Sequence, residues 1–289
     1  MGWEQFRYDG KRVLVSGGAT GMGAAVARLV SELGGEVVVA DVAPVDPTVA
    51  QSVRMDLRDR SSIDAALAEI GGPIHSIFSC AGVSGAPFAP VDVMLVNFVG
   101  ARHLVESAIE SLMGSGSSIA FISSIGGLGW ERELVRIIEL LDTPDFAAAQ
   151  VWCESNLVGE PAQAEELAAA AYVFSKQTID AYVQRQAVPL CHRGIRINAT
   201  GPGPTQTPLM DATPSWQVFG DVLFKSAMRR EPSTPEEQAP PLVFLNSDAA
   251  GSVSGQVLNV DAGYTAGGFL GVHDTPLVES LVPREVPAT

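Results

Sequence analysis

A short apolar run, a glycine-rich loop and a helical pattern follow one another near the start of the chain. Residues 12–16 read Arg-Val-Leu-Val-Ser, and residues 17–23 read Gly-Gly-Ala-Thr-Gly-Met-Gly. Apolar side chains then recur at positions 26, 29, 30 and 33, the spacing of one helical face. Glycines let a backbone approach a phosphate closely, and the start of a helix offers it N–H donors. This order predicts an α/β fold that binds a nucleotide at Gly17, Thr20, Gly21, Met22 and Gly23.

An acidic residue ends the next predicted strand. Residues 36–40 read Glu-Val-Val-Val-Ala, and Asp41 follows. Counted from Gly23, Asp41 lies close to the spacing of about 20 residues at which a carboxylate accepts the adenosine ribose hydroxyls. The same carboxylate would repel a 2′-phosphate, and the loop at 17–23 contains no Arg or Lys. The sequence therefore favours NAD over NADP as the cofactor. A purely structural glycine turn is the alternative interpretation.

Strand and helix patterns go on alternating along most of the chain. Further strands are predicted at residues 53–55, 74–79, 118–122, 194–199 and 257–261. Helices are predicted from Ser61, with Asp64 at capping spacing, and at residues 91–113, 172–190 and 235–245. This alternation predicts one domain over residues 1–289, a Rossmann-type doubly wound parallel sheet of the α/β class with right-handed crossovers.

Two segments depart from the alternation. Residues 125–171 carry three amphipathic stretches without a strand between them, which predicts a helical insertion. Residues 264–289 form a C-terminal extension, in which the prolines after Gly267 indicate an extended arm. The insertion is expected to be either a lid over the site or part of a subunit interface.

Polar and small residues follow several of the predicted strands. Asp56-Leu57 comes after the third strand, Ala81-Gly82 after the fourth and Ser124 after the fifth. In an open α/β sheet the ligand lies outside the carboxyl ends of the strands, so we expect these residues to meet the glycine loop at one edge. Asp56 either contacts the adenine or merely ends its strand.

A phenol and an ammonium lie four residues apart in the stretch Tyr172-Val173-Phe174-Ser175-Lys176. On a helix these two side chains share one face. A cation beside a tyrosine favours the phenolate and lowers its pKa from about 10. The motif therefore predicts a proton-transfer pair, whereas a surface helix with an unrelated Tyr and Lys is the plainer interpretation.

Charge and composition exclude several other classes of protein. The net charge of −15 and the pI near 4.6 argue against a nucleic-acid or anionic-membrane partner. No apolar run approaches the roughly 18 residues that span a bilayer, so we expect a cytoplasmic protein. Cys80, Cys153 and Cys191 lack any paired spacing and are expected to be reduced and buried. The four histidines show no ligand spacing, so no metal is predicted.

With these motifs in order, the sequence resembles the short-chain dehydrogenase/reductase family from Val13 to about Gly263. The glycine loop and the stretch Ser79-Cys80-Ala81-Gly82 match cofactor elements of that family, although Ser79-Cys80 replaces its usual asparagine pair. The resemblance is nearest to the bacterial 3α-hydroxysteroid dehydrogenase/carbonyl reductase type, which also carries a helical insertion before the catalytic tyrosine.

The resemblance implies an NAD-dependent oxidoreductase that transfers a hydride between nicotinamide and a secondary alcohol or ketone. It also implies roles for particular residues. The implied catalytic residues are Asn97, Ser124, Tyr172 and Lys176. The implied cofactor contacts beyond the loop and the strand ends above are Tyr172, Lys176, Pro202, Gly203, Thr205 and Thr207. Family members are commonly dimers or tetramers, so a homodimer or homotetramer is expected.

Large apolar side chains suggest a hydrophobic pocket and an alicyclic substrate such as a hydroxysteroid. They are Leu128, Trp130, Trp152, Leu209, Met210, Trp216, Val218, Phe219, Leu223 and Phe224. Placement in the core or at a subunit interface explains them equally well. Two further functions stay open: a non-catalytic NAD-binding redox sensor, and a reductase of small non-steroid carbonyls.

Overall fold

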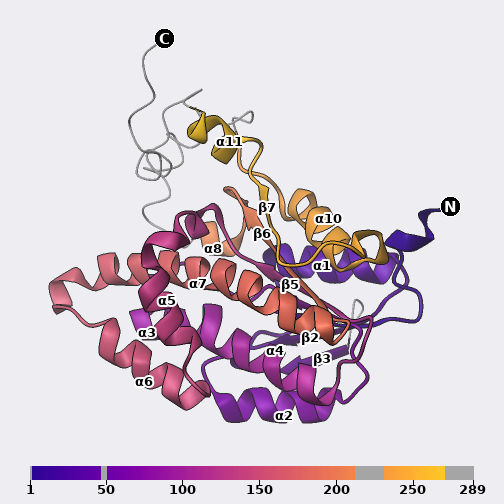
Figure 1. The fold of residues 1–289 in the computed structure, drawn as a ribbon, viewed down its shortest axis with the longest axis horizontal. Coiled ribbons are helices and arrows are strands. Elements are labelled where there is room, and N and C mark those ends of the chain that lie inside the picture. Colours follow the sequence, from indigo (N-terminus) through magenta and orange to yellow (C-terminus); the bar gives the residue numbers. More distant parts are fainter. Residues whose placement is uncertain (1, 47–50, 212–230, 271–289) are drawn as a thin grey trace.

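A seven-stranded parallel sheet forms the centre of the molecule, with the strands in the order β3-β2-β1-β4-β5-β6-β7 (Figure 1). The computed structural model describes residues 2–46, 51–211 and 231–270. Chain order reverses at β1, which lies between β2 and β4. Such a reversal is the point of an open sheet where ligands bind. The predicted doubly wound parallel sheet is confirmed.

The strands and helices alternate much as predicted. The strands are β1 (Arg12–Ser16), β2 (Glu36–Asp41), β3 (Gln51–Arg54), β4 (Ser76–Ser79), β5 (Ser118–Ile122), β6 (Arg196–Pro202) and β7 (Val257–Val260). The α-helices are α1 (Gly21–Glu32), α2 (Arg60–Ile70), α3 (Pro90–Met94), α4 (Gly100–Ser111), α5 (Leu134–Leu141), α6 (Phe146–Asn156), α7 (Ala164–His192), α8 (Pro208–Asp211), α10 (Pro235–Asn246) and α11 (Tyr264–Phe269). The short turns of helix are η1 (Trp3–Phe6), η2 (Leu95–Val99), η3 (Ile125–Gly127), η4 (Trp130–Glu133), η5 (Pro161–Gln163) and η6 (Asp248–Ala250).

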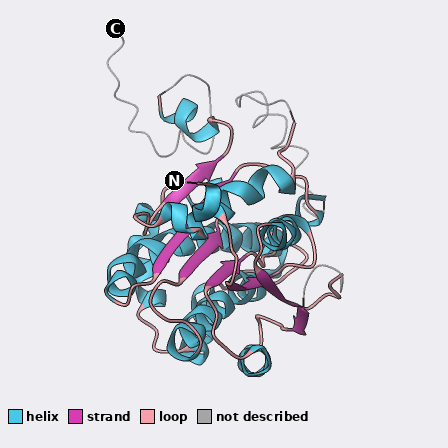
Figure 2. Ribbon diagram, turned by 90° about the vertical axis from the view of Figure 1, so that its right-hand side faces the viewer, coloured by secondary structure: helices cyan, strands magenta, loops and turns pink. Residues whose placement is uncertain are grey.

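Helices cover both faces of the sheet, as Figure 2 shows. Alternate residues of one strand enter different cores: Leu14 of β1 joins the core under α2, α4 and α7, whereas Val13 and Val15 join the core under α1 and α10. A strand buried on both faces needs apolar residues at every position. This is why β1 and β2 read as continuous apolar runs.

The insertion is helical, but its last part differs from the prediction. The third amphipathic stretch of the predicted insertion covers residues 163–167. This stretch and the helix predicted from Tyr172 form one helix, α7, which begins at Ala164. No Gly or Pro lies between Gln163 and Tyr172, and four alanines precede Tyr172, so nothing ends the helix there. The two preceding helices, α5 and α6, bury Ile137, Leu140 and Phe146 in the same core as α4 and α7.

Other local predictions need correction. Helix α2 is capped by Asp59, which accepts from the backbone N–H of Ser61, so Ser61 lies inside the helix rather than at its cap. Residues 264–269 form α11, so the tail is helical at Gly267, and residues 271–289 lie outside the described part of the chain. Cys153 is buried as expected, but Cys80 is only partly buried and Cys191 is exposed.

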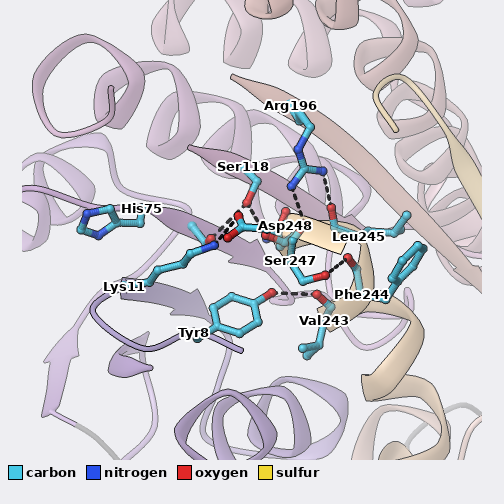
Figure 3. Close-up of polar contacts among 12 residues, drawn as sticks. Tyr8, Lys11, His75, Ser118, Arg196, Val243, Phe244, Leu245, Ser247 and Asp248 are labelled. Atoms are coloured by element: carbon cyan, nitrogen blue, oxygen red, sulfur yellow. Dashed lines mark hydrogen bonds and ion pairs between the residues drawn. The ribbon is translucent and has the colours of Figure 1, made fainter. Parts of the chain in front are cut away.

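Side chains from three distant segments hold the carboxyl end of α10 against the start of the sheet (Figure 3). The last carbonyls of a helix have no partner within it. Here the Tyr8 hydroxyl, the Arg196 guanidinium and the Ser118 hydroxyl donate to three of them, at 2.7, 2.6 and 2.8 Å. The acceptors are the carbonyls of Val243, Leu245 and Asn246. Burial and the neighbouring Asp248 raise the pKa of Tyr8 far above its ordinary range, so the phenol stays a donor.

Replacing Tyr8 with Phe tests this anchor. The side chain is fully buried, so the variant keeps its packing and loses one buried hydrogen bond. We expect the free energy of unfolding to fall by about 1–2 kcal/mol in urea denaturation. Binding of NADH should be unchanged, because the residues that Tyr8 anchors lie at the amino ends of the strands. An unchanged unfolding free energy would contradict a stabilising role for this bond.

Candidate active site

Three glycines shape the loop between β1 and α1. Gly17 and Gly21 have φ of +73° and +56°, a region that favours glycine. A Cβ on Gly17 would overlap the backbone of Ala81, and one on Gly23 would overlap the carbonyl oxygen of Gly17. The loop after β1 therefore lies against the loop after β4, and only glycine at these two positions allows so close a contact between backbones. This geometry fits the pyrophosphate of a dinucleotide at the start of α1.

A cavity of about 290 Å³ opens beside this loop. Most of the predicted cofactor residues line it: Gly17, Thr20, Gly21, Met22, Gly23, Asp41, Asp56, Leu57, Ala81, Gly82 and Thr207. Tyr172, Lys176, Pro202, Gly203 and Thr205 do not. The sequence argument missed Ala40, Val42, Met55, Arg58, Val83, Phe88, Val96 and Pro208, and it considered Leu209 only for the substrate. It gave no cofactor role to Cys80, which also lines the cavity. Most of these are apolar, and nothing in their local sequence separates a residue that lines a cavity from one in the core.

Two acids lie at the part of the cavity formed by β2 and β3. Asp41 accepts backbone N–H groups of Ala19 and Ala43, each at 2.9 Å, which holds its carboxylate beside the glycine loop. Asp56 pairs with Arg58 at 2.8 Å, and hydrogen bonds from Arg58 hold the pKa of Asp56 below its usual range. Asp56 thus remains an anion that can accept from an adenine amino group.

The turn after β6 reaches back to the glycine loop. Thr205 donates to the carbonyl of Gly203 at 3.0 Å, and Thr207 donates to the carbonyl of Thr205 at 3.3 Å. The methyl group of Thr207 would lie 3.3 Å from a Cβ on Gly21. Pro202, Gly203 and Thr205 therefore shape the turn, whereas Thr207 carries it into the cavity wall.

Asn97 lies in a π-helical turn, η2, between α3 and α4. Its amide accepts from the backbone N–H of Val83 at 2.8 Å and donates to the Val83 carbonyl at 2.9 Å and to the Ser175 hydroxyl at 3.0 Å. The extra residue of a π-turn rotates the following side chains, and such turns are frequent at functional sites. Asn97 thereby links the loop after β4 to α7, within the turn before Lys176.

Lys176 is buried beside the proposed catalytic tyrosine. Its Nζ donates to the carbonyl of Ile122 at 2.9 Å and lies 5.7 Å from the centre of the Tyr172 ring. A Cβ on Gly82 would lie 3.4 Å from Oδ1 of Asn97 and 3.8 Å from this Nζ. Gly82 therefore lies between Asn97 and Lys176, next to the cavity. Burial lowers the pKa of Lys176 to about 8, against the attraction of Asp180.

The tyrosine itself departs from the sequence argument. Burial raises the pKa of the Tyr172 phenol above its ordinary value, and the Ser124 hydroxyl opposes part of that rise. The expected lowering by Lys176 does not outweigh the loss of water around the ring. Ser124 also accepts a hydrogen bond from the backbone N–H of Gly126 at 3.1 Å. Its own hydroxyl hydrogen is not used in that bond and can be donated to another group. The structure thus brings Asn97, Ser124, Tyr172 and Lys176 together.

Two of the proposed substrate-pocket residues pack elsewhere. Trp152 stacks on Phe174 with ring centres 5.8 Å apart, and Trp130 also packs against the main core. Trp216, Val218, Phe219, Leu223 and Phe224 lie outside the described residues. In the described part of the chain no group of three His, Cys, Asp or Glu side chains could hold a metal ion. No helix within the described ranges has the length and apolar character to span a bilayer.

The fold and site define a Rossmann-type oxidoreductase, and comparison with known proteins gives its family. Residues 11–133 match the model described as short chain dehydrogenase, and residues 158–265 match the model described as enoyl-(acyl carrier protein) reductase. A cis-4-hydroxycyclohexanecarboxylate dehydrogenase of Sinomonas cyclohexanicum is 31% identical over 270 residues, which cover 88% of this chain and 96% of the relative. The chain belongs to the short-chain dehydrogenase/reductase family.

The expected resemblance to the 3α-hydroxysteroid dehydrogenase type is also confirmed, at modest identity. The 3α-hydroxysteroid dehydrogenase/carbonyl reductase of Comamonas testosteroni is 28% identical over 257 residues, covering 88% of this chain and 96% of the relative. The crystal structure of the 3α-hydroxysteroid dehydrogenase of Pseudomonas sp. B-0831 with NADH superposes with a TM-score of 0.73 at 26% identity, covering 92% of this chain and all of that one.

Replacing Gly23 with Ala tests whether the loop holds a dinucleotide. The added methyl would overlap the carbonyl oxygen of Gly17, so the loop must shift away from its ligand-binding form. We expect the dissociation constant for NADH, measured by fluorescence titration, to rise about 10- to 100-fold. Gly114→Ala is the matched control, because nothing lies within 4 Å of a Cβ there. Equal affinities for NADH in the two variants would show that the loop does not belong to the binding site.

Proposed function

We propose that the protein is an NAD-dependent dehydrogenase that interconverts a secondary alcohol and a ketone. The observation that carries this proposal is the convergence of Asn97, Ser124, Tyr172 and Lys176 beside a cavity shaped for a dinucleotide. The bound nicotinamide supplies or accepts the hydride. The protein must then supply the proton and stabilise charge on the substrate oxygen.

Tyr172 exchanges that proton with the substrate oxygen as general acid or base. Lys176 offers an ammonium 5.7 Å from the tyrosine ring, which favours the phenolate as it forms, and it can also hold hydroxyls of the nicotinamide ribose. Ser124 donates its hydroxyl to the substrate oxygen and polarises the carbonyl. Asn97 holds α7 to the loop after β4 and can bind a water that connects Lys176 to solvent.

The substrate class rests on the pocket and the relatives together. A cyclohexane ring bears the hydroxyl in the compound named for the Sinomonas enzyme, and a steroid bears it in that named for the Comamonas enzyme. Both are alicyclic secondary alcohols. Gly126 leaves the space beside Ser124 and Tyr172 open, since a Cβ there would lie 3.5 and 3.7 Å from these side chains. We therefore infer a hydrophobic alicyclic alcohol, such as a hydroxysteroid, as the substrate.

The insertion and the oligomer belong to the same proposal. Helices α5 and α6 share a core with α7, the helix that carries Tyr172 and Lys176. Through this contact the insertion can act on substrate selection as a lid, or it can extend a subunit interface of a homodimer or homotetramer. Removal of the whole insertion would uncover that core, so the interface is better tested by light scattering on the intact chain.

Replacing Tyr172 with Phe tests the proton-transfer role. The variant keeps the ring and loses the hydroxyl, so we expect kcat for cyclohexanol or a 3α-hydroxysteroid with NAD to fall about 10²- to 10⁴-fold. Affinity for NADH should stay within about twofold. Tyr8→Phe makes the same substitution far from the site and should keep full turnover. Undiminished turnover in Tyr172→Phe would refute the dehydrogenase mechanism, and NADH binding without turnover of any carbonyl by the unmodified protein would favour a redox sensor.

Replacing Asp41 with Ser tests the choice of NAD over NADP. The change removes the carboxylate that would repel a 2′-phosphate and keeps a hydroxyl for the ribose. We expect the ratio of the dissociation constants for NADPH and NADH to fall about tenfold. Asp64→Ser, on the exposed surface of α2, changes the net charge equally and should leave the ratio unchanged. A similar ratio in all three proteins would show that Asp41 does not select the cofactor.

A further inference from the structure

A second ionisable side chain is buried one helical turn beyond Lys176. Asp180 is only 4% exposed and lies on the same face of α7 as Lys176 and Tyr172. Its Oδ2 lies where a Cβ on Gly127 would overlap it, so the glycine lets the carboxyl approach the start of the insertion. Asp180 thus faces the end of β5, where Ser123 and Ser124 follow Ile122.

The contacts of Asp180 do not account for its burial. Its Oδ1 has no hydrogen-bond partner among the described residues, and none of the ion pairs between described residues includes it. The nearby hydroxyl of Ser123 donates to the carbonyl of Lys176 at 3.3 Å. A buried carboxyl with one oxygen left unpaired destabilises a fold. A role outside stability would explain its presence.

The charged and polar groups around Asp180 come from three elements. Lys176 lies on α7 itself, Glu131 lies in η4 of the insertion, and the hydroxyl of Ser123 faces it from the end of β5. Burial raises the pKa of Asp180 to about 7, and Glu131 adds to the rise, while Ser123 and Lys176 oppose it. Asp180 therefore changes charge close to the pH at which Lys176 does.

Lys176, like Asp180, forms no ion pair with a described residue at direct contact distance. Its Nζ donates to the carbonyl of Ile122, a neutral partner, and burial disfavours its charge. Asp180 is the charge that opposes this effect most, whereas burial raises the pKa of the Cys80 thiol, at the end of β4, and keeps that thiol neutral. In a buried site two opposite charges interact over longer distances than in water. Asp180 is thus placed to hold the proton on Lys176.

We propose that Asp180 is a positioning residue of the proton-transfer site: its buried carboxylate keeps Lys176 charged and so sets the pH range over which Tyr172 exchanges its proton. This inference rests on the proposed dehydrogenase function. It adds a second buried charge behind the lysine, on the side of α7 that contacts the insertion. Glu131 gives the insertion an electrostatic influence on the site.

The test is the variant Asp180→Asn, which keeps the shape of the side chain and removes its charge. Lys176 should then lose its proton at lower pH, and Tyr172 should form the phenolate only at higher pH. We expect the acid limb of the kcat profile for cyclohexanol oxidation with NAD to move up by about one pH unit. The affinity for NADH, measured by fluorescence without turnover, should fall off at high pH, and the pH at which it does so should be lower by about the same amount in the variant.

A stability measurement separates this role from a structural one. The pKa of Asp180 in the folded protein lies above its ordinary value of 3.8, so the stability that the protonated carboxyl provides is lost as pH rises from about 4 to about 7. At pH 8 the melting temperature of Asp180→Asn should therefore equal or exceed that of the unmodified protein. A lower melting temperature, with turnover reduced equally at all pH values, would show that Asp180 is structural and would overturn the proposal.

Two further variants complete the test. Glu131→Gln alters an exposed residue and lets Asp180 ionise at lower pH. The pH at which the affinity for NADH falls should then move in the opposite direction, to a higher value. Thr178→Val removes a buried hydroxyl from α7 without changing charge and should leave both profiles in place. If Tyr172→Phe abolishes turnover but neither charge variant moves a limb, this inference alone fails. Full turnover in Tyr172→Phe would instead refute the proposed function.

Discussion

The close approach of the loops after β1 and β4 is the contact on which the site depends. Gly17 lies against the backbone of Ala81, and Gly23 lies against the carbonyl of Gly17, with no room for a Cβ at either glycine. The sheet reverses its strand order at β1, so these loops leave the same edge on opposite sides of it. The reversal provides a crevice, and the two glycines let the loops pack together at the start of α1, where a pyrophosphate can bind.

Helix α7 carries Tyr172, Lys176 and Asp180 on one face, and all three are ionisable groups that lie away from water. Lys176 reaches the end of β5 through the carbonyl of Ile122, and Asn97 ties the same helix to the loop after β4. Burial disfavours the ionised forms of Tyr172, Lys176 and Asp180 alike. Lys176 and Asp180 also shift each other's pKa, and the Ser124 hydroxyl lowers that of Tyr172, which suits the proposed transfer of a proton near neutral pH.

Local patterns predicted much of this arrangement but not all of it. The glycine loop, Asp41 and the Tyr172 motif carry signals in the spacing of a few residues, and the structure places the first two at the cavity. Arg58 carries no such signal, because only the packing of β2 beside β3 brings it to the cavity wall. Helix propensity across residues 164–171 joined the insertion to α7, although the sequence pattern indicated a break.

The sequence by itself determined the alternation of strands and helices, the acid at the end of β2 and the order of the residues proposed to be catalytic. These features depend on near neighbours in the chain, through periodicity, glycine conformation and helical spacing. Only the tertiary structure decided which charges share a buried space. Asp180 reads as an ordinary helix residue in sequence, yet its position against Gly127 and behind Lys176 depends on α7 packing on β5. Desolvation and long-range charge coupling arise from that packing, and no local pattern encodes them.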